Sequence, residues 1–198
     1  MLLLLGVFVG LSQGCATLRV TNSGRTADEQ FLQTEAIREA VRKLSLAALR
    51  ERTVWVDPTY IYDSNFASAE QSFMLGELRN KLLIEGAKLA ERREDASIIV
   101  EPRAGAIGVN RSEFLLGIPG SNVPVGEVDV DDNNIPVVLP EVAIVKNRKQ
   151  RGFAAVTVTA YYRDTGEFAA TSGPFVGRTI RTDVWFFGLG PRTSGDIP

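Results

Sequence analysis

The residues of this chain that could do chemistry are few in kind. The sequence holds one cysteine, Cys15, and no histidine. A Ser-His-Asp triad, a histidine general base and a histidine-ligated zinc site are therefore excluded. A single cysteine also cannot form a disulfide within the chain. Any catalysis would have to use carboxylates, Lys, Tyr or Ser.

Cys15 closes an apolar run that starts at Met1. The segment Leu11-Ser12-Gln13-Gly14-Cys15 resembles the end of a bacterial lipoprotein signal peptide, in which a small residue precedes a cysteine that becomes acylated. The resemblance implies a signal peptide over residues 1–14, lipid chains such as palmitate on Cys15, and a tether over 15–25. Because Ala16 rather than Asp follows the cysteine, it also implies export to the outer membrane, facing the periplasm.

Two other interpretations of this segment remain open. One is a buried amino-terminal helix with a free cysteine in the core, and the other is an uncleaved signal anchor. The segment holds about ten apolar residues, whereas a helix that spans a bilayer needs about twenty. We therefore favour a lipid anchor on Cys15.

Carboxylates offer the remaining routes to catalysis or metal binding. Asp57 and Asp63 are the pair that we nominate, because two acidic groups can hydrolyse a glycosidic bond. Aspartates at strand ends mostly form turns, so binding is favoured over catalysis. An acidic patch at 127–132 suggests calcium, but Asn134 stands where an EF-hand loop needs glycine, and no glutamate closes the loop. We expect a solvated turn, with no metal and no cofactor.

Two apolar stretches are candidates for contact with a partner or a membrane. The first, Phe114, Leu115, Leu116 and Ile118, lies in a segment at about 106–140 that is rich in proline and glycine. We interpret this segment as a long loop, and loops beyond about 15 residues are usually functional or disordered. Folding back onto the core is an equally weighted alternative for the first stretch. The second is Trp185, Phe186 and Phe187, whose aromatic rings suit a membrane interface, although closing the core is the interpretation that we favour for it.

The elements that would position these residues follow from periodicity. Thr26-Ala27-Asp28-Glu29 has the spacing of a capping box and predicts a helix start. Ile37, Val41, Leu44 and Ala48 recur on one face of that helix. A second helix is expected from about Ser68 to Glu85, ended by Gly86 in a left-handed conformation. Strands are expected at 53–57, 87–90 and 97–101.

The carboxyl-terminal part has the pattern of an antiparallel sheet. Strands are expected at 142–145 and 154–162, on either side of a basic turn with Lys146, Arg148, Lys149 and Arg151. Asp164-Thr165-Gly166-Glu167 predicts a hairpin that returns at 168–171. The fold class is therefore α/β, of the α+β kind. We expect a single domain over 26–198 with a mixed sheet of about five or six strands, packed by two amphipathic helices.

The stretch from Leu78 through Gly86 to Val100 resembles the periplasmic domain of envelope-assembly lipoproteins, among them the curli secretion lipoprotein and the activators of penicillin-binding proteins. The chain is also similar to an uncharacterised lipoprotein family with Leu-Leu-Gly-Ile-Pro and Gly-Leu-Gly-Pro signatures, found here at Leu115 to Pro119 and Gly188 to Pro191. The second resemblance implies no known activity.

Charge and motifs together favour a binding protein. With 22 basic and 24 acidic residues, the chain has a formal net charge of −2 and lacks the basic stripe of a nucleic-acid binder. We therefore expect an envelope lipoprotein, held on the membrane by lipid, that acts as a non-catalytic binding or assembly factor. A surface-tethered hydrolase that uses carboxylates is the alternative. The expected partner is a protein or a second copy of the chain, and not a nucleic acid.

Overall fold

The computed structural model describes residues 26–62, 68–120, 126–130, 133–137 and 140–197, with the backbone alone at 68, 126–130 and 133–137. Cys15, Asp63 and the acidic residues Asp131 and Asp132 lie outside the described residues. One mixed sheet of six strands runs through the molecule in the order β2-β1-β3-β6-β7-β8. The α/β fold class, with a single domain and a mixed sheet, is confirmed.

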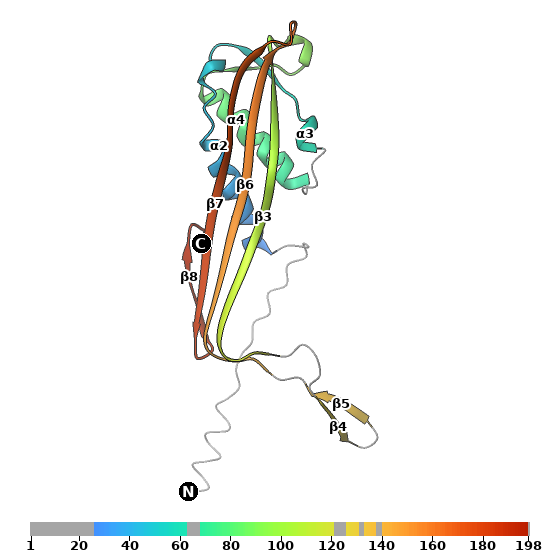
Figure 1. Cartoon of the computed structure of the whole chain (residues 1–198), viewed down its shortest axis with the longest axis vertical. Helices are drawn as coiled ribbons and strands as arrows, with labels where there is room; N and C mark the ends of the chain where they lie inside the picture. Colours follow the sequence, from blue (N-terminus) through green and yellow to red (C-terminus); the bar gives the residue numbers. More distant parts are fainter. Residues whose placement is uncertain (1–25, 63–67, 121–125, 131–132, 138–139, 198) are drawn as a thin grey trace.

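The described helices are α2 (Ala27–Arg42), α3 (Thr59–Tyr62) and α4 (Ser68–Ile84), with short 3-10 helices at Ala47–Leu49 and Arg93–Asp95. The strands of the main sheet are β1 (Thr53–Val56), β2 (Lys88–Leu89), β3 (Ile98–Ile118), β6 (Val142–Tyr162), β7 (Phe168–Phe186) and β8 (Leu189–Gly195). The hairpin of β4 (Gly126–Val130) and β5 (Asn133–Val137) continues the chain between β3 and β6 (Figure 1). Strand β1 pairs in parallel with β2 and β3, and the other pairings are antiparallel.

The two predicted helices form, but α2 ends at Arg42, so the predicted helical face is wrong beyond Val41: Leu44 follows the helix, and Ala48 is exposed in the 3-10 helix at Ala47–Leu49. The Thr26 hydroxyl accepts from the Glu29 amide, and the Glu29 carboxylate accepts from the Thr26 amide, which completes the capping box of α2. Helix α4 buries Met74, Leu78 and Leu82 completely. Gly86 follows with a φ of +90°, the left-handed conformation expected of a residue that ends a helix.

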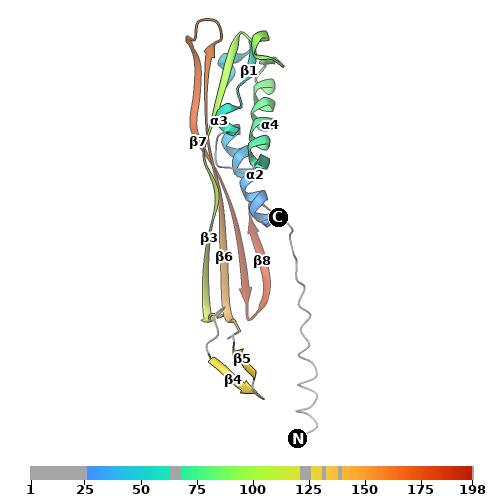
Figure 2. The same ribbon diagram turned by 90° about the vertical axis from the view of Figure 1, so that its right-hand side faces the viewer.

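Helices α2 and α4 cover one surface of the sheet, and only in one half of the molecule (Figure 2). In that half, Ala154, Val156, Val158 and Ala160 of β6 point into the core, where they join the buried faces of both helices. We call this half the head. Burial of so many apolar side chains is the main source of its stability.

Helix α2 lies unusually close to the sheet because two strand residues carry no side chain. A Cβ atom on Gly177 would collide with the backbone of Ala36 and Ala40, and one on Gly152 would collide with the backbone of Leu32. The Thr179 hydroxyl donates to the Leu32 carbonyl oxygen at 2.8 Å on the same surface. These glycines therefore set the distance between α2 and strands β6 and β7.

The predicted long loop at 106–140 is wrong over most of its length. Strand β3 continues to Ile118 and pairs with β6 down to Val142, and residues 126–130 and 133–137 pair as β4 and β5. The predicted basic turn is wrong too, because Lys146 to Arg151 lie inside β6. The more buried residues of this part of β6 are polar, such as Lys146, Arg148 and Gln150, so the sequence lacks the apolar alternation that marks a half-buried strand.

We call this uncovered part of the sheet the extension: residues 109–118 of β3, 142–152 of β6, 178–186 of β7, and β8. It begins beneath the first turns of α2 and runs well past that helix (Figures 1 and 2). Its two surfaces are the α2 side, which carries Gly152 and Thr179, and the open side opposite. Cross-strand partners share a side, so the pairing register assigns every strand residue to one side or the other.

Within the described residues, no helix has both the length and the apolar character needed to cross a membrane.

Candidate functional site

The two apolar stretches singled out in the sequence meet at the far end of the extension. Leu116 of β3 pairs with Val145 of β6, and Val145 pairs with Phe186 of β7. These three side chains form one row across the open side. Residues about 70 positions apart in the chain thus become neighbours because β6 lies between β3 and β7.

Most of these apolar residues are exposed. Phe114 is 63% exposed, Leu116 53% and Ile118 55%, and Phe186 and Phe187 reach 54% and 77%. Folding back of the first stretch and core closure by the tail are therefore both wrong. Strand pairing carries these residues beyond the helices, where no second described layer faces them. We call Phe114, Leu116, Ile118, Val142, Phe186 and Phe187 the distal cluster.

Leu115 and Trp185 differ from their neighbours because they lie on the α2 side. Both pair with Lys146 of β6, and both are half-buried. The guanidinium of Arg148 lies 5.3 Å from the centre of the Trp185 ring, a cation–π contact. Of the predicted contact residues, these two are thus held by charged neighbours rather than by other apolar groups.

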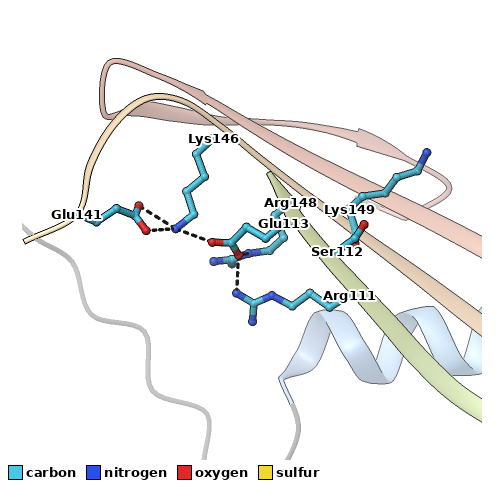
Figure 3. A network of polar contacts seen from close by, with 7 residues as sticks. All are labelled: Arg111, Ser112, Glu113, Glu141, Lys146, Arg148 and Lys149. Carbon is cyan, nitrogen blue, oxygen red and sulfur yellow. Dashed lines mark hydrogen bonds and ion pairs between the residues drawn. The ribbon is translucent and has the colours of Figure 1, made fainter. Parts of the chain in front are cut away.

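A charged network surrounds Glu113 on the α2 side of the extension (Figure 3). The Glu113 carboxylate lies 2.9 Å from Arg111, 3.0 Å from Lys146 and 3.2 Å from Arg148. Hydrogen bonds from Arg111 first, and then from Lys146, lower the pKa of Glu113 to about 2. Lys146 also reaches Glu141 at 2.8 Å, and the hydrogen bond that its ammonium group donates to that carboxylate is the main cause of the raised pKa of Lys146.

Arg181 forms an ion pair that joins α2 to the extension. Arg181 of β7 lies 2.5 Å from Asp28, in the first turn of α2, and 3.2 Å from Asp183. Asp183 is buried and accepts a hydrogen bond from the Thr193 hydroxyl of β8 at 2.7 Å. On the α2 side, ion pairs therefore join the helix to β7, and a hydrogen bond joins β7 to β8.

The family of the chain is known from comparison with protein-family models. Residues 9–198 match the model of a family of unknown function, DUF6655. The chain belongs to this family. Comparison of this DUF6655 chain with curated proteins gave no match. The family description states no activity.

The nominated catalytic carboxylate behaves as a turn former. Asp57 Oδ1 accepts from the Thr59 amide at 3.1 Å and from the Thr59 hydroxyl at 2.6 Å, and so fixes the turn that leads into α3. Its intended partner, Asp63, lies outside the described residues. A depression of about 400 Å³ lies beside this turn, lined by Trp55, Val56, Pro58, Tyr62, Ser72, Leu75, Gly76 and Arg79.

The described residues hold no group of three or more Cys, Asp or Glu side chains placed to bind a metal ion. Of the acidic patch, Asp131 and Asp132 lie outside the described residues, and Glu127 and Asp129 are described by their backbone in β4. The described geometry therefore directs attention to the extension and its distal cluster.

Proposed function

We propose that this protein is a membrane-anchored lipoprotein of the cell envelope that acts without catalysis, as a binding or assembly factor. In this proposal Cys15 carries the lipid, and the distal cluster makes the functional contact. One observation carries the proposal: two apolar stretches from distant parts of the chain are brought together at the end of an uncovered sheet and left exposed. Contiguous exposed apolar residues mark interaction sites.

The difference between the head and the extension supports a contact role for the distal cluster. The head has a core of its own, whereas the extension presents strands with little buried apolar surface. A sheet normally buries at least one face. An extension that projects from a stable head and ends in apolar side chains is therefore suited to meet a surface outside the chain.

The anchor is tested by metabolic labelling with a fatty acid, followed by membrane fractionation of the wild type and of Cys15→Ser. We expect the wild type to take up label and to sediment with membranes, and the variant to lose the label. An unlabelled wild-type protein in the soluble fraction would contradict the anchor.

The contact is tested by placing a photo-crosslinking amino acid at Leu116 and, as a matched control, at Ile84. Ile84 is 72% exposed on α4 in the head, so it offers a similar apolar side chain away from the distal cluster. We expect a discrete adduct from position 116 in cells and none from position 84. Adducts of equal yield from both positions would argue against a contact at the distal cluster.

A further inference from the structure

The basic side chains on the two sides of the extension differ in whether they form ion pairs. The described extension holds eight basic side chains: Arg111, Lys146, Arg148 and Arg181 on the α2 side, and Lys149, Arg151, Arg178 and Arg192 on the open side. All four on the α2 side form ion pairs. The four on the open side form none with the described residues. Figure 3 shows Lys149 extending away from the network around Glu113.

The absence of acidic residues explains this difference. The extension contains two carboxylates, Glu113 and Asp183. Both fall on the α2 side, because they pair with Arg148 of β6 from either flank. On the open side of the described extension, four cations therefore stand without a carboxylate from the extension itself. Asp196, directly after β8, accepts a hydrogen bond from the Ile180 amide at 2.8 Å and forms no ion pair with a described cation. Uncompensated charge of one sign on a surface attracts a partner of the opposite sign.

Two of these cations flank a depression. Arg151 and Arg178 lie on adjacent strands in diagonal positions, because Arg151 pairs with Ile180 and Arg178 pairs with Phe153. These four residues and Thr179 line a hollow of about 360 Å³. Arginine forks bind phosphate oxygens in a bidentate manner, and two of them at diagonal positions can reach one phosphate group. The hollow thus joins phosphate-binding groups to an apolar floor.

We propose that the open side of the extension binds the surface of an anionic phospholipid bilayer. The cations Lys149, Arg151, Arg178 and Arg192 contact lipid phosphates, and the distal cluster enters the acyl region next to them. Aliphatic side chains such as Leu116, Ile118 and Val142 match lipid chains, whereas a nucleic acid would offer them no partner. Charge and apolar surface together are the two components of binding at a membrane surface.

This inference deepens the proposed function and rests on it for the position of the anchor. From Cys15 to Thr26 the chain can span at most about 36–40 Å, at roughly 3.3–3.6 Å per residue. Arg181, next to the start of α2, is five residues along β7 from Phe186, which is about 17 Å. A lipid on Cys15 therefore leaves enough chain for the distal cluster to touch the same membrane.

The test is flotation of the full-length chain with phospholipid vesicles, using Cys15→Ser so that no lipid anchor contributes. Vesicles of phosphatidylcholine alone are compared with vesicles that also contain phosphatidylglycerol. We expect tighter binding to the anionic vesicles. Arg151→Gln with Arg178→Gln should weaken that binding roughly 25-fold, because each basic residue near an anionic surface contributes a factor of about five. Thermal melting of each variant confirms that it is folded.

The matched control is Arg52→Gln with Arg79→Gln, which removes two exposed cations from the head and changes the net charge equally. This pair should bind as the parent does. An equal loss in both double variants would overturn the proposal, as would binding that ignores phosphatidylglycerol. Tight binding of a nucleic acid duplex without vesicle binding would overturn it in favour of a nucleic-acid partner.

Failure of this inference and failure of the anchor are separate results. If fatty-acid labelling requires Cys15 but the vesicle assay shows no preference for anionic lipid, the lipid anchor is supported and membrane binding by the open side is rejected. If the chain binds anionic vesicles more tightly but takes up no fatty acid in cells, the open side binds membranes by itself and the lipid anchor on Cys15 is rejected.

Discussion

Strands β3, β6 and β7 run through both halves of the molecule, yet the two halves are built on different principles. In the head, α2 and α4 cover the strands, and the side chains toward them are small and apolar, such as Ala154 and Val156. In the extension, the same strands carry ion-paired residues on one side. On the other side they carry apolar groups and cations that form no ion pair with the described part of the chain. The difference teaches that one sheet can form a buried core at one end and present exposed charged and apolar side chains at the other.

Truncation of a leucine to alanine should lower the free energy of unfolding far more in the head than in the extension. Leu78→Ala in the head removes a side chain that is fully buried against the sheet, and should lower the free energy of unfolding by about 3 kcal/mol. Leu116→Ala in the extension removes an exposed side chain, and should change it by no more than about 0.5 kcal/mol. Urea unfolding of both variants measures the difference. Similar costs for the two would mean that the distal cluster is buried in solution.

Alanine substitutions at two glycines test how closely α2 approaches the sheet. Gly177→Ala places a methyl group against the backbone of Ala36 and should lower the free energy of unfolding by about 2 kcal/mol. Gly108→Ala on the open side of β3 is the control, because a Cβ there meets no atom within 4 Å. We expect its unfolding midpoint to stay close to that of the wild type. A harmless Gly177→Ala would show that α2 does not dock as closely as described.

Substitution of Glu113 in the charged network should have the smallest effect on the free energy of unfolding, and this effect should depend on pH. At neutral pH, Glu113→Gln should destabilise the protein by about 1 kcal/mol, since it leaves three cations without their shared carboxylate. The folded-state pKa of Glu113 is lowered to about 2, so its contribution is complete above its ordinary value and is lost as pH falls through that range. The stability gap between wild type and variant should therefore close between about pH 4.5 and 2. A gap that stays constant over this range would contradict the network.

The head could be predicted from sequence because its elements obey local rules. The Thr26–Glu29 capping box, the buried face of α4 and the glycine at 86 all appear where periodicity and capping place them. The close docking of α2 on Gly152 and Gly177 was missed. Those glycines are 25 residues apart on two strands, and only the pairing of β6 with β7 brings them under one helix.

The extension resisted prediction for a physical reason. Apolar alternation signals a strand only where one surface buries apolar side chains. Most residues of 109–118 are exposed, and the more buried residues of 142–152 include Lys146, Arg148 and Gln150. The apolar residues at 114–118 and 185–187 stand out in the sequence, but their meeting depends on a pairing register that composition does not reveal. The grouping of open-side cations that lack an ion pair among the described residues was missed, because Arg178 and Arg192 are distant in sequence from Lys149 and Arg151. The lipid on Cys15 and the resemblance to envelope-assembly lipoproteins stay predictions.

Hydrogen exchange of the full-length chain, with and without anionic vesicles, tests the division between head and extension most directly. Without vesicles, amides of the extension should exchange faster than those of the head, because sheet regions with few buried contacts open more often. Vesicles should slow exchange in residues 109–118, 142–152 and 178–195 and leave α4 unchanged. Slower exchange in the head, or an extension that vesicles do not affect, would contradict the assignment of membrane contact to the extension.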